Sequence, residues 1–233
     1  MESAFGRAET AFFQTFLQRV FTWMVLGLAV TGIVAGVIGS SDSLLTTLTD
    51  SPGIFLLVIV AQLGLVLAIS FGINRMSAAT ATVLFFVYAA TVGVTFALVF
   101  EMYSTQSIFT TFLITAGMFA TLAFIGATTQ RDLSKLGTIL IAALVGLIIA
   151  TVVNIFVANS ALYWITTYAG VLIFAGLTAY DMQKLKKFGE ASPGGETESR
   201  MAVLGALALY LDFINLFLFL LRIFGQRRSR TWT

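Results

Sequence analysis

Two aspartates lie within long apolar segments of the chain, where a carboxylate needs a chemical reason. Asp212 lies about half way along the apolar segment 201–224, and Asp181 ends the apolar segment 161–181. A carboxylate at the centre of a lipid-embedded helix costs about 2.5–3.5 kcal/mol on insertion scales. Two carboxyl groups within a few ångströms in a poorly solvated site cannot readily both ionise, so they titrate as one unit. The two aspartates are therefore predicted to sense pH together, without a histidine.

The same two carboxylates are candidate metal ligands. Calcium takes carboxylate and carbonyl oxygens and needs no nitrogen or sulphur ligand, so Asp181 and Asp212 could bind it. Two alternatives stay open: Asp212 could be an uncharged structural residue hydrogen-bonded to a neighbouring helix, and Asp181 could mark a solvated helix end before the lysines of 184–187. The segment limits also place Asp212 deeper than Asp181, so a tilted helix or an irregular helix end is needed to bring them together.

Small and polar residues follow Asp212 around one side of its segment. Gly205, Ala208, Asp212 and Asn215 lie at positions i, i+3, i+7 and i+10, which fall on one stripe of a helix. Such a stripe is predicted to face the interior of a helix bundle, with leucine and phenylalanine on the other sides. Asn215 and Tyr210 are interpreted as polar groups of this helix face or of a cation path.

Arg75 ends the second apolar segment at about the same predicted depth as Asp181. An ion pair between Arg75 and Asp181 is geometrically possible, and with Asp212 the three residues form the predicted pH sensor and gate. The alternative role for Arg75 is an anchor whose charged end reaches the membrane interface.

The amino-acid composition indicates which class of protein contains these residues. The 233 residues are 58% hydrophobic and 10% charged, whereas soluble domains carry about 25% charged residues. A mean hydropathy of +0.97 with a net charge of +2 excludes intrinsic disorder, and no basic stripe predicts nucleic acid as a partner. Because the chain has no Cys and no His, disulfides, thiol nucleophiles, imidazole triads and zinc or haem ligation through these residues are excluded. No cofactor is predicted.

Charge-free stretches define the elements that must position these residues. A bilayer-spanning helix needs about 20 mainly apolar residues. The stretches predict an all-α membrane bundle, one domain over 1–233, with the segment 184–200 as its one flexible loop. An interfacial amphipathic turn that leads into the first span is predicted from Phe12, Phe13, Phe16, Leu17 and Val20. The seven predicted spans are 20–39, 53–73, 78–100, 108–127, 137–158, 161–181 and 201–224.

The distribution of basic residues predicts the orientation. With the N-terminus in the cytoplasm, the internal segments carry most of the arginines and lysines, and the first three external loops carry only Asp42, Asp50 and Glu101. Seven full crossings place Arg227, Arg228 and Arg230 outside, against this rule. A re-entrant last segment is the alternative, so the side of the C-terminus stays open.

Several motifs resemble one known family over nearly the whole chain. The most specific is Tyr210-Leu211-Asp212-Phe213-Ile214-Asn215-Leu216-Phe217 with Leu220-Leu221-Arg222 after it, supported by Tyr180-Asp181, Arg131-Asp132-Leu133-Ser134 and Phe86-Val87-Tyr88. The chain resembles the transmembrane Bax inhibitor motif family, in its bacterial Bax inhibitor-1 type branch. The resemblance implies seven helices with the last one central, and a calcium leak whose opening depends on protonation of an aspartate pair.

The resemblance also implies residue roles. Asp181 and Asp212 occupy the two sensor positions, and Arg75 aligns with an arginine that contacts the first aspartate when the path is open. Two departures are evident: the loop between the aspartates is longer than in compact bacterial relatives, and Gln62 is the nearest polar residue where some relatives have an acidic residue in the second span.

Three functions are compatible with these residues. The first is a pH-sensitive calcium or cation leak channel of a bacterial cytoplasmic (inner) membrane, which is not an enzyme and has lipid and cations as partners. The second is a non-transporting regulator that binds other membrane proteins, such as proteases or cell-death factors. The third is an intramembrane aspartyl protease, which paired aspartates would allow. The chain departs from such proteases because Asp212 follows Tyr210-Leu211 rather than Gly-x-Gly, and no proline follows Pro193.

Overall fold

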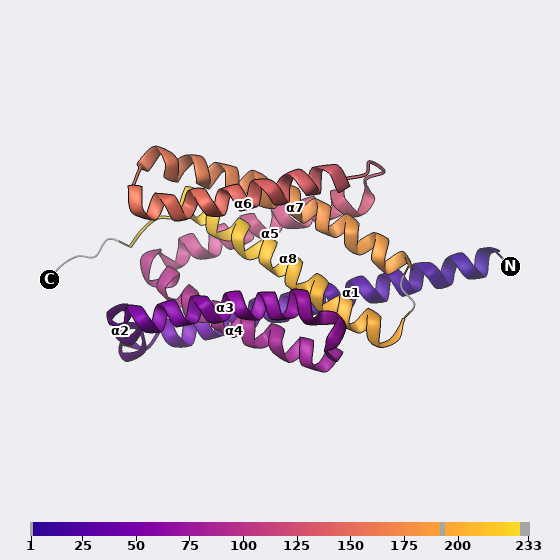
Figure 1. Ribbon diagram of the computed structural model, residues 1–233, viewed down its shortest axis with the longest axis horizontal. Helices are drawn as coiled ribbons and strands as arrows, with labels where there is room; N and C mark the ends of the chain where they lie inside the picture. The colour runs from indigo at the N-terminus through magenta and orange to yellow at the C-terminus, as the bar shows by residue number, and fades with distance from the viewer. Residues whose placement is uncertain (1, 192–193, 229–233) are drawn as a thin grey trace. The chain divides into compact units, whose positions relative to one another are not determined.

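The computed structural model describes residues 2–191 and 194–228, with side chains from residue 14 onward, and the regular secondary structure in these ranges is helical. This confirms the predicted all-α class. Figure 1 shows the helices in chain order. The described helices are α1 (Glu2–Gly39), α2 (Asp42–Asp50), α3 (Pro52–Gly72), the short 3₁₀ helix η1 (Ile73–Arg75), α4 (Ala78–Met102), α5 (Thr105–Thr128), α6 (Ser134–Val157), α7 (Ser160–Ala191) and α8 (Gly195–Phe224).

Seven helices in the described part of the chain are long and apolar enough to cross a membrane, as predicted. Each contains one predicted span, apart from Ile73, which begins η1 directly after α3, and Ala158, which follows α6 in a left-handed conformation. Of the apolar stretch of α8, 72% of the residues are buried, against 6% in α3 and in α6. The last helix is therefore the most enclosed of the seven, whereas α3 and α6 expose most of their apolar side chains.

The predicted flexible loop over 184–200 is wrong. Helix α7 continues to Ala191, and α8 begins at Gly195. Lysine and leucine are good helix formers, and charge alone does not end a helix that leaves the lipid. The break comes instead at a glycine pair, since Gly194 and Gly195 have φ angles of 77° and 72°, which disfavour other residues.

Two further elements differ from the prediction. Residues 2–39 form one continuous helix rather than an interfacial turn followed by a span; Phe16 and Val20 are fully buried there, and the side chains of Phe12 and Phe13 lie outside the described residues. The connection between α1 and α3 contains the short helix α2, whose first turn is capped by the Ser41 hydroxyl accepting from the Leu44 amide. The serine cap was available in the sequence as a signal.

The chain divides into two compact units. Unit 1 comprises 1–105, 188–210 and 227–233, and unit 2 comprises 106–187 and 211–226. Unit 1 therefore holds α1 to α4 with the first half of α8, and unit 2 holds α5, α6, most of α7 and the second half of α8. The single domain over 1–233 stays a prediction.

Small residues let the helices approach closely inside each unit. In unit 1, a Cβ on Gly93 of α4 would lie 2.8 Å from the Thr31 carbonyl oxygen of α1. In unit 2, a Cβ on Gly126 of α5 would collide with the Ala179 backbone of α7. Such contacts are typical of helices that pack in lipid. The hydrophobic effect does not drive helices together there, so their association depends on close packing.

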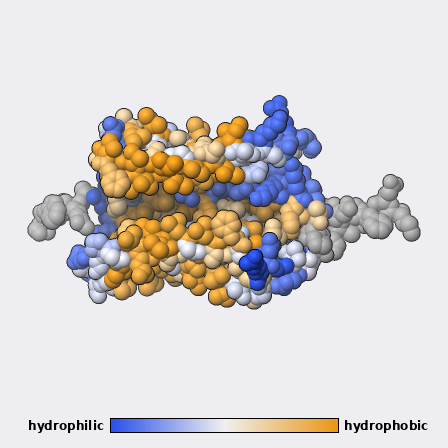
Figure 2. Space-filling view, in the orientation of Figure 1, coloured by the Kyte–Doolittle hydropathy of each residue, from blue (hydrophilic) through white to orange (hydrophobic). Residues whose placement is uncertain are grey.

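Aliphatic and aromatic side chains fill the core of unit 2 and also cover its outer faces. Figure 2 shows hydrophobic residues over the sides of the helices and hydrophilic residues toward their ends. On α6, Ile155 and Phe156 are 72% and 84% exposed, a pattern that only a lipid environment tolerates over such an area. The core cluster comprises Leu147, Ile173, Phe174, Leu177, Leu216, Phe219 and Leu220.

Candidate functional site

Asp212 lies in the part of α8 that belongs to unit 2 and is only 4% exposed. Its Oδ2 atom is the one buried side-chain oxygen or nitrogen without a hydrogen-bond partner among the described residues. A buried polar atom without a partner costs about 1–3 kcal/mol, and more when it is charged. The structure therefore places at Asp212 a buried carboxyl group with one unpaired oxygen, and its functional role stays a prediction.

Asp181 lies on α7, also within unit 2, and is partly buried. The two carboxylates are close enough to interact electrostatically, so that an ionised Asp181 repels an ionised Asp212. Lys184, three residues further along α7, acts on Asp181 with the opposite sign. The two residues predicted as a sensor thus lie in one unit, and their action as a pair stays a prediction.

The site around Asp181 and Asp212 offers few ligands for a metal ion. Among the described residues, no group of three or more acidic side chains is placed to hold a metal ion. Calcium takes six to eight oxygen ligands, so Asp181 and Asp212 would provide only part of its coordination. Calcium binding by these two residues stays a prediction.

The polar neighbours of Asp212 make local contacts. The Asn215 side-chain amide donates to the Leu211 carbonyl oxygen at 2.8 Å, within the same helix. Around them α8 is buried on nearly every side: Phe213 and Leu216 are 3% and 0% exposed. Of the predicted stripe, Gly205 and Asp212 are buried, whereas Ala208 and Asn215 are only partly buried. The phenylalanine and leucine faces that the sequence pattern assigned to the other sides are buried as well.

Tyr210 lies in unit 1, where it is fully buried. Its hydroxyl is 2.6 Å from the Thr31 hydroxyl oxygen, and its ring makes an edge contact with Tyr88 at 5.8 Å. This is a structural arrangement between α1, α4 and α8 of that unit. A role for Tyr210 in a cation path stays a prediction.

Arg75 is exposed at the end of η1, in unit 1. The predicted ion pair with Asp181 of unit 2 stays a prediction. The turn that carries Arg75 is held by Arg200, whose Nη1 donates to the carbonyl oxygens of Asn74 and Met76 at 3.1 and 3.5 Å. The sequence pattern counted Arg200 only as a basic residue and gave no sign of this contact.

Gln62 on α3 forms a polar contact within unit 1. Its side-chain amide donates to the Thr91 carbonyl oxygen of α4 at 2.8 Å. The nearest polar residue of the second span is thus an amide that hydrogen-bonds to the neighbouring helix.

The α5–α6 connection is tied to α7 by side chains whose function the sequence did not reveal. The Gln183 amide donates to the Arg131 carbonyl and accepts from the Leu133 amide, at 2.8 and 2.9 Å. Lys187 Nζ lies 2.8 Å from Asp132. Together, Gln183 and Lys187 hold the α5–α6 connection beside α7.

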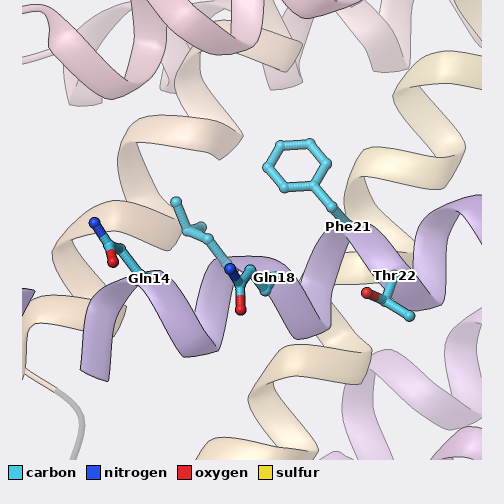
Figure 3. A pocket seen from close by; sticks show the side chains of 5 residues that line it. Gln14, Gln18, Phe21 and Thr22 are labelled. Carbon is cyan, nitrogen blue, oxygen red and sulfur yellow. The ribbon is translucent and has the colours of Figure 1, made fainter. Parts of the chain in front are cut away.

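A shallow hollow on α1 contains none of the predicted site residues. Figure 3 shows the side chains of Gln14, Gln18, Phe21 and Thr22 projecting from this helix. With Leu17 they line the hollow, and all of them belong to unit 1.

Comparisons with known proteins identify the group of proteins that this chain resembles. The sequence model of a family described as "Inhibitor of apoptosis-promoting Bax1" matches residues 13–229. The chain is 45% identical over 217 residues to the inner membrane protein YbhL of Escherichia coli (strain K12), covering 92% of this chain and 93% of that protein. It is 44% identical to a protein of Borreliella burgdorferi and 41% identical to one of Deinococcus radiodurans, each covering 92% of this chain and 93% and 91% of the relative.

Proposed function

Because this chain belongs to the Bax inhibitor family of integral membrane proteins, we propose that it is a pH-sensitive calcium leak of the bacterial cytoplasmic membrane, controlled by Asp181 and Asp212. One observation carries the proposal: Asp212 is buried with an unpartnered Oδ2, within the electrostatic field of a second carboxylate. The N-terminus lies in the cytoplasm in this proposal, and the protein is not an enzyme.

The mechanism follows from the cost of two charges in one poorly solvated place. Two ionised carboxylates repel each other strongly where the dielectric constant is low. A shared proton relieves this repulsion, whereas a passing cation can do so only while the proton is absent. The proton and the cation therefore compete for the same oxygens, and the protonation state of the pair decides whether the seam between α7 and α8 accepts a cation.

The direct test is calcium flux into liposomes at two pH values, about pH 6 and about pH 8. The wild-type protein should pass calcium down its gradient at rates that differ between the two pH values. Asp212→Asn, which keeps the size of the side chain, should remove this difference. Asp132→Asn is the matched control, since Asp132 is an exposed carboxylate of the same unit. Wild-type flux that does not respond to pH, or an Asp212→Asn variant that responds like the wild type, would overturn the proposal.

Two other functions predict different results in the same preparation. A non-transporting regulator of proteases or cell-death factors would retain membrane-protein partners and pass no ions. An intramembrane aspartyl protease would be labelled by a transition-state analogue of that protease class, and labelling would require both Asp181 and Asp212.

A further inference from the structure

In unit 2, α7 and α8 meet along an antiparallel seam with three chemically distinct levels. The aspartates form the first level. Phe174 of α7 stacks on Phe219 of α8 at the second, with ring centroids 5.9 Å apart and an angle of 29° between the planes. Tyr163 of α7 faces Arg222 of α8 at the third. Figure 1 shows α7 in orange and α8 in yellow.

The spacing along each helix supports this seam independently of the contacts. On α8, Asp212, Phe219 and Arg222 lie at positions i, i+7 and i+10, one face of a helix. On α7, Tyr163, Phe174 and Asp181 lie at i, i+11 and i+18, which also share a face. Because the helices are antiparallel, Asp181, Phe174 and Tyr163 of α7 follow one another in the same order as Asp212, Phe219 and Arg222 of α8.

The aromatic level is tightly fitted. Phe219 is 8% exposed, and a Cβ on Gly170 of α7 would come within 2.5 Å of its ring. Gly170 thus provides the space that Phe219 occupies, and Phe174 covers another side of the same ring. In the proposed leak, an ion that follows the seam beyond the aspartates passes these rings.

Arg222 lies directly after the rings, in the last turn of α8. Its guanidinium carbon lies 5.0 Å from the Phe219 ring centroid and 5.6 Å from that of Tyr163. Ring faces attract a cation through their quadrupole, and they hold the guanidinium in place without neutralising its charge as a carboxylate would. A full positive charge is therefore fixed at the end of the seam opposite the aspartates.

We propose that Arg222 is the electrostatic barrier of the cation route, which limits the rate and the valence selectivity of ion passage along the α7–α8 seam. This rests on the proposed leak function and adds a specificity-determining residue to it. A fixed positive charge repels an ion in proportion to the ion's own charge. The barrier that Arg222 creates is therefore twice as high for calcium as for potassium.

The dependence of the barrier on ion charge distinguishes the loss of the Arg222 charge from a mere change in the size of its side chain. If Arg222→Gln removes the barrier, calcium flux should rise by the square of the factor by which potassium flux rises. If the shorter side chain only widens the route, both fluxes should rise by similar factors. Arg222→Lys keeps the charge and should leave the ratio of the two fluxes close to that of the wild type.

The experiment measures calcium and potassium flux in liposomes for the wild type, Arg222→Gln and Arg222→Lys, with Arg227→Gln as an exposed arginine control. Arg222→Met replaces Arg222→Gln if the glutamine variant is not recovered folded, as judged by circular dichroism. Equal rises for both ions, an unchanged Arg222→Gln flux, or an Arg222→Lys flux like that of Arg222→Gln would overturn the inference. A wild-type protein that passes no calcium would instead refute the leak function on which the inference rests.

Discussion

The hydroxyl groups of Tyr210 and Thr31 lie 2.6 Å apart in the buried interior of unit 1, joining α8 to α1. The Thr31 hydroxyl also lies 2.9 Å from the Ala89 carbonyl oxygen of α4 and 3.1 Å from that of Gly27. A threonine hydroxyl has one proton, which it gives to a carbonyl. Tyr210 is therefore the donor to Thr31, and three helices are held through one hydroxyl group.

Removing this hydroxyl should weaken the fold. Tyr210→Phe leaves Thr31 with one hydrogen bond fewer in a buried place, which should cost about 1 kcal/mol of the free energy of unfolding and lower the apparent Tm in detergent. Tyr168→Phe is the control, because Tyr168 is 54% exposed. Equal Tm values for the Tyr210→Phe variant and the wild type would show that the contact contributes nothing.

The contact between α5 and α7 predicts a large effect of a single methyl group. In Gly126→Ala the new Cβ meets the Ala179 backbone, which cannot move aside as a flexible side chain can. We expect a loss of about 1–3 kcal/mol or more in the free energy of unfolding. Gly117→Ala on the same helix meets nothing within 4 Å and should be neutral or should stabilise by up to about 1 kcal/mol. A thermal unfolding series in detergent compares them, and matching Tm values would contradict the predicted packing.

Asp132, in the connection between α5 and α6, should have an unusually low pKa. Hydrogen bonds from Lys187 and Ser134 lower the pKa of this exposed carboxyl group from 3.8 to about 2. Because the pKa is lowered by folding, the ionised group stabilises the fold above about pH 4, and this contribution is lost as the pH falls through about 2. Asp132 therefore stays ionised at neutral pH, which makes it a suitable control for Asp212.

Replacing the lysine tests the origin of this shift. In Lys187→Gln the pKa of Asp132, followed by NMR of its carboxyl carbon, should move from about 2 toward 3.8. Lys184→Gln removes an exposed lysine of the same helix and should leave the pKa near its wild-type value. A larger rise of the Asp132 pKa in Lys184→Gln than in Lys187→Gln would show that Lys187 does not cause the shift.

Membrane orientation can be tested cleanly because the chain has no cysteine. Ser40 and Gln130 are both exposed, in the α1–α2 and α5–α6 connections. With the N-terminus in the cytoplasm, a membrane-impermeant thiol reagent should label Ser40→Cys in intact cells and label Gln130→Cys only after lysis. The reverse pattern would invert the topology.

The membrane spans could be predicted because burying charge in lipid is costly. Each charge-free stretch had to become a helix, and among the described residues the predicted spans exceed their α-helices by one residue at each of two places, Ile73 and Ala158. The same argument failed beyond the lipid, where the lysines of 184–187 are compatible with a helix that simply continues into water. A charge pattern thus identifies the membrane-spanning part of a helix, and only caps and glycines identify its end.

The candidate site could be predicted only in part, because its contacts join residues far apart in the chain. A costly residue such as Asp212 is evident in an apolar segment, and its stripe follows from helical periodicity. The partner of Tyr210, by contrast, is Thr31 on the first helix, and nothing in either residue's neighbourhood indicates it. Arg222 lies on the same face of α8 as Asp212, which the sequence does show. Its contact with the Tyr163 ring of α7 is seen only in the structure.

The central claim is that Asp181 and Asp212 act as one titrating unit, and a double-mutant comparison of calcium flux against pH in liposomes tests it most directly. Residues that act as a unit give non-additive effects. We predict that Asp181→Asn and Asp212→Asn each abolish the pH dependence of calcium flux, and that the double variant behaves like either single one. Single variants that each keep a pH response, with the response lost only in the double variant, would show that the two carboxyl groups act independently.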